Sequence, residues 1–447
     1  MLNVETMSSS QQYIQLYEEQ RALLEQNSCP TMNAQRSAAA QLLAQKKLPT
    51  RRNERYRYFN VQEAFAPDYG VNLLRTLPAI DPYATYRCNV PNLSTQLYFV
   101  VNDTPMLHCA PNQPTEGVTI CAMREGGALL QEYYNKAVND ADTVAALNTM
   151  LAQDGIVVHV AAHTKVKHPI QLVNVCDATM VMMSNRRLLI VVEEGAEVQF
   201  LLCDHVAGKS AYLTTQVTEA FIGKQAKVDF YTIEENADNV NKLALYYVQQ
   251  QAESRVAMNG VTLHAGHSHN HVNVQLLGQH ADHFTAAAVI AGDRELVDYN
   301  IVVEHVAENC NSEMLYKYVL DDESEGAFAG KVLVREGAQH TTSQQTNANL
   351  CVTPTARAYA QPMLEIYADD VKCNHGSTVG KLDETALFYM RQRGIPEAEA
   401  RLLLQHAFVN EVLQRVELEH LRDRLAHLVE LRFRGELSKC AGCKMCQ

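Results

Sequence analysis

The chain has 447 residues, of which 47% are hydrophobic and 20% charged, an ordinary globular composition with room for about two to three domains. Its 38 basic and 51 acidic residues give a formal net charge of -13, and no long run of lysine and arginine offsets it. This balance excludes a broad nucleic-acid-binding face and a polybasic membrane anchor. The longest apolar runs, such as residues 188–192, are too short to span a bilayer, so we expect no membrane insertion.

Twelve cysteines lie at irregular positions along the chain. Their density is below that of a disulfide-stapled secreted scaffold, and the first ten residues show no pattern typical of a secretory signal. We therefore expect reduced thiols in a cytoplasmic protein, with a few of them available for metal or sulfur chemistry.

Residues 1–154 are expected to form a helical and loop-rich region. Apolar residues recur at helical spacing through residues 8–47, and Pro30 divides this stretch, which predicts two helices. A proline-rich stretch then predicts loops, and a short helical pattern returns between residues 131 and 151.

Residues 155–380 change to short runs of Val, Ile, Leu, Thr and Tyr with partial alternation, which is typical of strands with one buried face. A small turn motif precedes several runs. Its alanines, Ala196, Ala226, Ala252 and Ala281, are 30, 26 and 29 residues apart. This recurrence without an intervening helical pattern favours a stacked β-solenoid over a βαβ fold, with a sandwich or barrel as the alternative.

Residues 381–436 return to a helical pattern, and residues 437–447 form a cysteine-rich tail. Pro396 suits the first turn of a helix whose apolar stripe includes Leu403 and Phe408, and a leucine-rich helix follows from Leu418. The stripe packs on the protein's own core in one interpretation and docks a partner subunit in the other.

Cys373 and His375 form the first candidate site. In an extended segment residues two apart share a face, so the thiol and the imidazole would point the same way and suit iron or zinc. Two ligands are half of a four-ligand site, which suggests that another chain completes it. The alternative is a buried cysteine beside a surface histidine.

Two further groups are candidate metal ligands. His267, His269 and His271 would share one strand face and could bind a transition metal, although chance clustering on a solvated sheet face is more common. The tail residues Cys440, Cys443 and Cys446 have C-x₂-C-x₂-C spacing, which allows several thiolates to reach one metal or cluster, or else only adventitious metal or sulfur. No Walker loop is present, so we expect no ATP hydrolysis by the chain itself.

From residue 312 to residue 412 the sequence resembles the SufB/SufD family of iron–sulfur cluster assembly proteins, and its SufD branch more than its SufB branch. The most specific block is D-D-V-K-C-N-H-G at 369–376, followed by F-Y-M-R-Q-R-G-I at 388–395. Other matching residues are Ser312, Tyr316, Lys317, Phe328, Ala329, Gly330, Gln344, Gln345, Asn349, Leu350, 362–366 and 378–380. Upstream, residues 48–50 and 54–58 resemble the family's entry motif, with Tyr56 where Trp is usual.

The resemblance implies a right-handed parallel β-helix with helical parts at both ends, and a scaffold without turnover of its own. It implies pairing with a SufB-like paralogue through the β-helices, with His375 as the interfacial ligand and Cys373 beside it, holding iron or a nascent cluster transiently. A SufC-like ATPase would dock on residues 387–416, where the candidate contacts are Phe388, Tyr389, Arg393, Leu403 and Phe408. A homodimer is possible for the isolated chain, and a flavin is possible but has no support in the sequence.

Two other classes of protein are alternatives. A β-helix enzyme acting on polysaccharides would need a groove with several carboxylates and usually an export signal. A metal-binding or storage solenoid would use the histidine cluster and the cysteine tail. Binding of the ATPase partner distinguishes the assembly scaffold from both.

Overall fold

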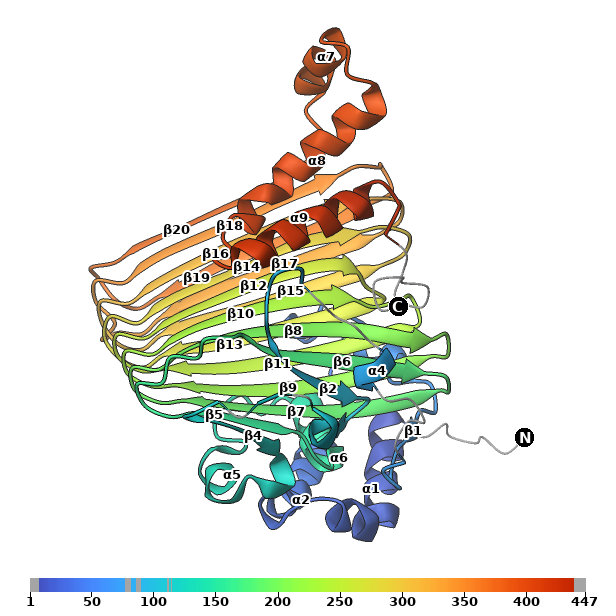
Figure 1. The fold of residues 1–447 in the computed structure, drawn as a ribbon, viewed down its shortest axis with the longest axis vertical. Coiled ribbons are helices and arrows are strands. Elements are labelled where there is room, and N and C mark those ends of the chain that lie inside the picture. The colour runs from blue at the N-terminus through green and yellow to red at the C-terminus, as the bar shows by residue number, and fades with distance from the viewer. Residues whose placement is uncertain (1–7, 77–81, 86–89, 111, 114, 438–447) are drawn as a thin grey trace.

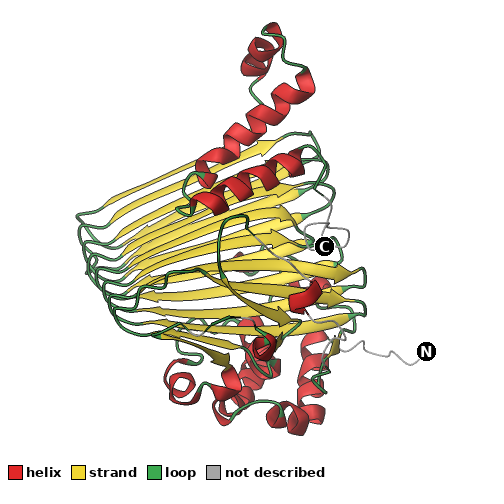
Figure 2. Cartoon of the chain, in the orientation of Figure 1, coloured by secondary structure: helices red, strands yellow, loops and turns green. Residues whose placement is uncertain are grey.

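Two long β-sheets face each other and form the body of the protein, with helices packed on their outer faces (Figure 1). The computed structural model describes residues 8–76, 82–85, 90–110, 112–113 and 115–437. Figure 2 shows strands stacked along the whole body and helices in both terminal parts. The chain is thus mainly β with a parallel β-helix core flanked by helical parts, as predicted, and it is neither a sandwich nor a barrel.

Successive strands alternate between the sheets, and each core strand pairs in parallel with the strand two positions further along the chain. Sheet A contains β1 (Gly70–Val71), β4 (Val118–Ala122), β5 (Ile156–Val160), β7 (Met182–Val192), β9 (Tyr212–Ile222), β11 (Val240–Gln250), β13 (His267–Leu276), β15 (Leu296–His305), β17 (Glu325–Val334) and β19 (Arg357–Ile366). Sheet B contains β2 (Gln96–Val101), β3 (Thr104–Pro105), β6 (Ile170–Ala178), β8 (Glu197–Gly208), β10 (Lys227–Glu235), β12 (Arg255–His264), β14 (Asp282–Ala291), β16 (Asn311–Leu320), β18 (Thr342–Cys351) and β20 (Lys372–Gly380). Since β2 already pairs with β6, paired strands begin upstream of residue 155, where we expected the β-helix to start.

The helices lie mainly before and after the solenoid. They are α1 (Ser9–Gln26), α2 (Pro30–Lys46), α3 (Val61–Ala64), α4 (Pro82–Thr85), α5 (Gly127–Tyr133), α6 (Thr143–Leu151), α7 (Glu384–Gln392), α8 (Glu397–Leu413) and α9 (Glu419–Phe433). Short 3₁₀ turns occupy Glu54–Tyr56, Leu107–Cys109 and Met123–Glu125. The predicted division at Pro30 is present, because proline is well suited to the first turn of α2.

A repeated turn explains why the coils stack. Before each of six sheet B strands, a residue with φ between 57° and 66° is followed by a small buried residue, and the strand then begins. The left-handed residues are Gly195, Gln225, Glu253, His280, Asn309 and His340. The small residues are Ala196, Ala226, Ser254, Ala281, Cys310 and Thr341, each at most 1% exposed. The predicted alanine recurrence is therefore a real ladder, but its third position is Ser254 and not Ala252.

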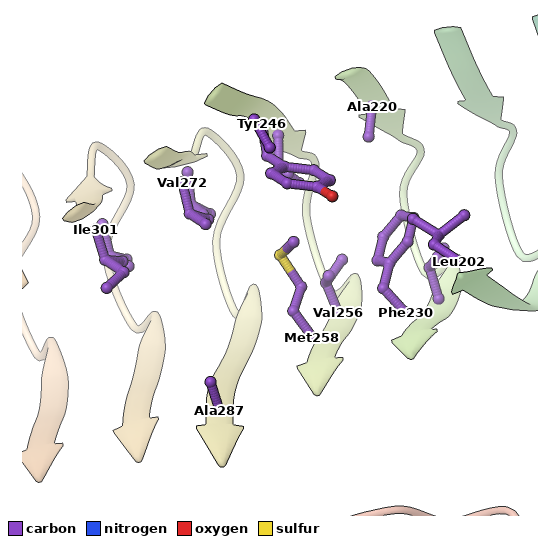
Figure 3. Packing of buried hydrophobic residues seen from close by; sticks show 14 of the residues in the cluster. Leu202, Ala220, Phe230, Tyr246, Val256, Met258, Val272, Ala287 and Ile301 are labelled. Atoms are coloured by element: carbon purple, nitrogen blue, oxygen red, sulfur yellow. The ribbon is translucent and has the colours of Figure 1, made fainter. Parts of the chain in front are cut away.

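Apolar side chains from the two sheets meet inside the β-helix. Figure 3 shows Tyr246 and Val272 of sheet A facing Phe230 and Met258 of sheet B. Each fully buried side chain of this size contributes about 1.5–3 kcal/mol to stability. This interior is continuous from the first coils to the last. The inward-facing side chains of a strand are therefore covered only where a further coil stacks over that strand.

Helices cover both outer faces. Side chains of α8 and α9, including Val409 and Leu425, pack on the outer face of sheet B. The N-terminal helices and α6 pack on the outer face of sheet A, where Leu43 and Leu147 join Leu243 in one apolar cluster. Among the described residues, no further strand stacks on the last coil, which is formed by β19 and β20.

Candidate functional site

The last coil of the β-helix is open. β19 and β20 are the final strands of sheets A and B, so one edge of each carries backbone N–H and C=O groups without a strand partner among the described residues. On β18 the inward-facing Ser343 and Gln345 are at most 1% exposed, whereas most of β20 is exposed because no further coil lies over it. Unpaired strand edges of this kind are templates for pairing with another chain.

Cys373 and His375 lie on the inner face of this open coil. Across the parallel ladder Cys373 is the register partner of Ser343 and His375 that of Gln345, and both partners face the solenoid interior. Cys373 is half-buried and packs against the interior core, while His375 is exposed. The two side chains share a face as expected, and they face the axis of the solenoid, where only its open end exposes them.

The surroundings of Cys373 favour a protonated thiol. Burial raises its pKa, and hydrogen bonding with the Ser343 backbone opposes that shift in part. A metal ion would have to displace this proton, because the thiolate is the form that binds metals. The pair therefore supplies one sulfur and one nitrogen donor and leaves the remaining positions of a metal site to another molecule.

A column of hydrogen-bonded side chains lies in the coils next to Cys373, and the sequence analysis did not predict it. The Ser343 hydroxyl lies 2.8 Å from that of Ser312, which lies 2.9 Å from Nε2 of His305. Next to it, the buried Oε1 of Gln345, directly below His375, has no hydrogen-bond partner among the described residues. The sequence signal was the coil repeat, since Ser343 and Gln345 stand 30 positions before Cys373 and His375, and Ser312 stands 31 positions before Ser343.

The predicted docking residues divide into two groups. Phe388, Tyr389 and Leu403 are 61%, 59% and 45% exposed on α7 and α8, which project from the body (Figure 1). The guanidinium of Arg393, also exposed, lies 5.1 Å from the centre of the Tyr389 ring. Phe408 is different, because it packs toward sheet B, with the ammonium of Lys317 4.9 Å from its ring.

The three histidines of β13 do share one face, but only His267 is exposed. His269 is buried beside the rings of Tyr56 and Phe59 and has Nδ1 2.8 Å from Asp298 Oδ2. His271 is also fully buried.

Nδ1 of His271 lies 3.0 Å from the side-chain oxygen of Asn300, and Nε2 lies 3.7 Å from a carboxylate oxygen of Asp140. The described part of the chain contains no group of three or more His, Cys, Asp or Glu side chains arranged to hold a metal ion. Metal binding by His267, His269 and His271 therefore stays a prediction, and Cys440, Cys443 and Cys446 lie outside the described residues.

A second polar cluster lies inside the solenoid. Lys242 Nζ is 2.6 Å from Asp204 Oδ2 and 3.4 Å from Glu234 Oε2, and Arg186 Nη1 is 3.1 Å from Asp204 Oδ1. These charges compensate one another, and burial with paired partners is typical of a structural ion-pair network. The hydrophobic pattern of the sequence did not predict this ion-pair network.

Comparison with known families identifies the relationship. The family model described as "SUF system FeS cluster assembly, SufBD core domain" matches residues 174–408, and "SufBD protein N-terminal region" matches residues 7–172. The chain belongs to the SufBD family. Its role is therefore in iron–sulfur cluster assembly.

Individual SufBD relatives support this placement. The chain is 29% identical over 416 residues to the iron–sulfur cluster assembly SufBD family protein slr0076 of Synechocystis, an alignment that covers 89% of this chain and 90% of that protein. It is 25% identical to SufD of Bacillus subtilis, over 76% of this chain and 80% of that one. It is 34% identical to SufD of Escherichia coli, over 37% of this chain and 39% of that one. None of the described helices is long and apolar enough to cross a membrane.

Proposed function

We propose that this chain is the non-catalytic, SufD-type scaffold subunit of a cytoplasmic assembly complex, pairing with a SufB-like paralogue and docking a SufC-like ABC ATPase. The observation that carries the proposal is the open last coil, which holds Cys373 and His375 between two unpaired strand edges. A partner that stacks on this end would cover the exposed inner face and bury both donors at the interface.

The iron site is proposed to form at that interface. His375 supplies an imidazole nitrogen, Cys373 supplies a sulfur after its proton leaves to solvent, and the partner supplies the other ligands. Iron or the nascent cluster is cargo here and leaves with the product. The column formed by Ser343, Ser312 and His305 holds Ser343, the register partner of Cys373, in place.

ATP hydrolysis is proposed to occur on the docked partner. The projecting part of α7 and α8 presents Phe388, Tyr389 and Leu403, and aromatic residues are enriched at the centres of protein interfaces. The C-terminal helices also pack on sheet B, so force applied to them reaches the solenoid through α8 and α9.

The test is co-expression of the full chain with its SufB-like and SufC-like partners, followed by iron and acid-labile sulfide analysis of the isolated complex. His375→Ala should leave the three subunits associated and lower iron and sulfide content at least about tenfold, since it removes a ligand and not an anchoring contact. Cys373→Ser should have a smaller effect in the same direction.

His420→Ala, at an exposed position on α9, is the matched control and should keep the full cluster content. Full content in the His375→Ala complex would contradict the assignment of the site. Failure of the wild-type chain to bind either partner would contradict the proposed function as a whole.

A further inference from the structure

A buried amide beneath the open coil has an oxygen without a hydrogen-bond partner. Gln345 of β18 is fully buried, and no described residue donates to its Oε1. Its Nε2, in contrast, donates to Sδ of Met314, one coil earlier, at 3.4 Å. Since a buried polar atom without a partner lowers stability, its presence in a native fold requires an explanation. The proposed function assigns this amide no role.

The amide of Gln345 lies in a space that a glycine leaves open. Gly330 belongs to the facing sheet, and a Cβ at that position would lie 2.7 Å from Nε2 of Gln345 and 2.6 Å from Cζ of Phe328. The amide nitrogen is thus enclosed and directed to Met314, and rotation of the planar group would lose this contact. The amide oxygen is therefore held in place on the other arm of the same group.

His375 is the neighbour of this amide on the open side. It is the register partner of Gln345 on β20, and paired strands are about 4.8 Å apart. The His375 ring is exposed, and none of the described residues forms a hydrogen bond or an ion pair with it. Because nothing holds the ring, rotation about its side-chain bonds can bring a ring nitrogen to the amide oxygen.

Two histidines of β13 show the contact that such a register produces in this fold. Nδ1 of His269 lies 2.8 Å from Oδ2 of Asp298, and Nδ1 of His271 lies 3.0 Å from Oδ1 of Asn300. Asp298 and Asn300 are the register partners of these two histidines on β15. A histidine on a parallel strand of this β-helix can therefore reach the side-chain oxygen of its register partner through Nδ1.

A glutamine oxygen is also used as a partner of histidine in this protein. Nδ1 of His283 lies 2.7 Å from the amide oxygen of Gln250. An amide oxygen only accepts hydrogen bonds, so the ring nitrogen that contacts it must carry the proton. In a neutral imidazole the other nitrogen, Nε2, then holds the free lone pair that a metal ion needs.

We propose that Gln345 is a positioning residue of the assembly site. Its Oε1 accepts the Nδ1 proton of His375, which leaves the lone pair of Nε2 for the iron or the nascent cluster. Histidine ligands of metals commonly donate their second ring nitrogen in this way, and the contact fixes both the tautomer and the orientation of the ring. The metal-directed part of this inference rests on the proposed function, whereas the hydrogen bond itself is tested without metal.

The first measurement uses the full-length chain without metal. The ¹⁵N chemical shifts of the histidine rings, at about pH 8.5, report which nitrogen of the neutral ring is protonated, since this is roughly two units above the ordinary pKa of histidine. His375→Ala assigns the signal. We expect the proton of His375 mainly on Nδ1 in the wild type and mainly on Nε2 in Gln345→Met, which keeps the side-chain volume and removes the acceptor. Equal tautomer ratios would overturn the proposal.

The second measurement is the iron and acid-labile sulfide content of the complex with the SufB-like and SufC-like partners. Gln345→Met should lower both at least about tenfold with the three subunits still associated. Gln345→Glu should restore most of the content, because its carboxylate also accepts the Nδ1 proton. The thermal unfolding midpoint of Gln345→Met should not fall, since the substitution removes an unpartnered buried oxygen.

Asn349→Leu is the matched control. Asn349 is also buried on the inner face of β18 with an unpartnered amide oxygen, but its register partner is Val379, whose side chain has no proton to donate. This variant should keep the tautomer of His375 and the cluster content. An equal loss in Asn349→Leu would overturn the specific role of Gln345.

The cluster content also separates this inference from the proposed function. Full content in Gln345→Met alone would overturn only the positioning role. Full content in both Gln345→Met and His375→Ala would contradict the proposed site and the positioning role together.

Discussion

Burial of His271 by the N-terminal segment perturbs its protonation. Burial first, and the positive charge of Arg55 second, lower its pKa from 6.5 to about 4, although Asp140 opposes the shift. His269 adds a further unfavourable charge interaction. The neutral imidazole is therefore the form that the folded protein stabilises.

This shift predicts acid sensitivity. Between pH 6.5 and pH 4 the unfolded chain binds more protons than the folded one, so this contribution to stability is full above pH 6.5 and lost as the pH falls toward 4. We expect His271 alone to account for about 2 kcal/mol of lost unfolding free energy between pH 7.5 and pH 5. Urea unfolding of the wild type and of His271→Asn at both values measures it.

His420→Asn, at an exposed position, should keep the wild-type pH dependence. An equally steep loss of stability in His271→Asn would show that other groups cause it. His305 works in the same direction, since burial lowers its pKa to about 4, so a residual slope is expected in the variant.

The left-handed turn residues offer a second test at this scale. His280 has φ 60°, and its side chain is exposed. A residue with a Cβ is strained in this region by about 1–3 kcal/mol, and glycine is not, although glycine loses more chain entropy on folding.

We therefore expect His280→Gly to raise the unfolding free energy by about 0.5–1 kcal/mol in urea titrations. The reciprocal change, Gly195→Ala, should lower it, because a Cβ at Gly195 (φ 66°) would lie 2.5 Å from Nδ1 of His163. Destabilisation by His280→Gly would show that its side chain makes a contribution that outweighs the backbone strain.

At the scale of the element, the surroundings of α8 change along its length. Its first part, with α7, projects from the body, and Leu403, Phe388 and Tyr389 of this projecting part are exposed. Its second part packs on sheet B through Phe408 and Val409. Core packing of the apolar stripe therefore holds for the second part of α8, and docking of a partner on its exposed first part stays a prediction.

Two variants test this division. Phe388→Ser with Tyr389→Ser should abolish binding of the SufC-like partner and leave the thermal unfolding midpoint unchanged, because both rings are mostly exposed. Phe408→Ala should destabilise the chain by about 2 kcal/mol, since a half-buried ring and its contact with Lys317 are lost. Pull-down and calorimetry measure the two effects. Loss of partner binding by Phe408→Ala with unchanged stability would reverse the assignment.

The sequence predicts those features whose signal lies in neighbouring positions or in positions one coil apart. The stacked turns at Ala196 and Ala226 were visible because each small residue recurs one coil later. Burial of His269 was not visible, because Tyr56 and Phe59, more than 200 positions away in the chain, cover it. A strand pattern specifies which residues share a face and carries no information about what lies over that face.

At the scale of the whole molecule, the candidate site depends on which coil is the last. The pattern of Cys373 and His375 predicts a shared face, and their exposure follows only from the end of the strand stack after β20. The neighbouring Val379 is 56% exposed on the same strand. The sequence analysis left a homodimer of the isolated chain possible, and we expect any such dimer to form through this apolar, unpaired end.

That expectation is testable with Val379→Lys. A buried charge at the contact should weaken self-association at least about tenfold, which corresponds to about 1.4 kcal/mol. Sedimentation over a range of concentrations measures the dimer dissociation constant. Val181→Lys, at a 45% exposed apolar position on a remote turn, should dimerise as the wild type does. Equal dimer affinity in both variants would place the contact elsewhere.

Residues 54–58 of the N-terminal region also contact β19, the last strand of sheet A. Gln361 of β19 donates to Glu54, 307 positions earlier, and the rings of Tyr58 and Tyr359 stack with centres 4.6 Å apart. At about 10 residues per second on the ribosome, the early segment waits roughly half a minute for this strand to be synthesised. Most coils can stack as they emerge, each on the one before, but this contact waits for β19. A nascent product that stops before residue 357 therefore cannot form it, so the contact reports that synthesis has passed the last strand of sheet A.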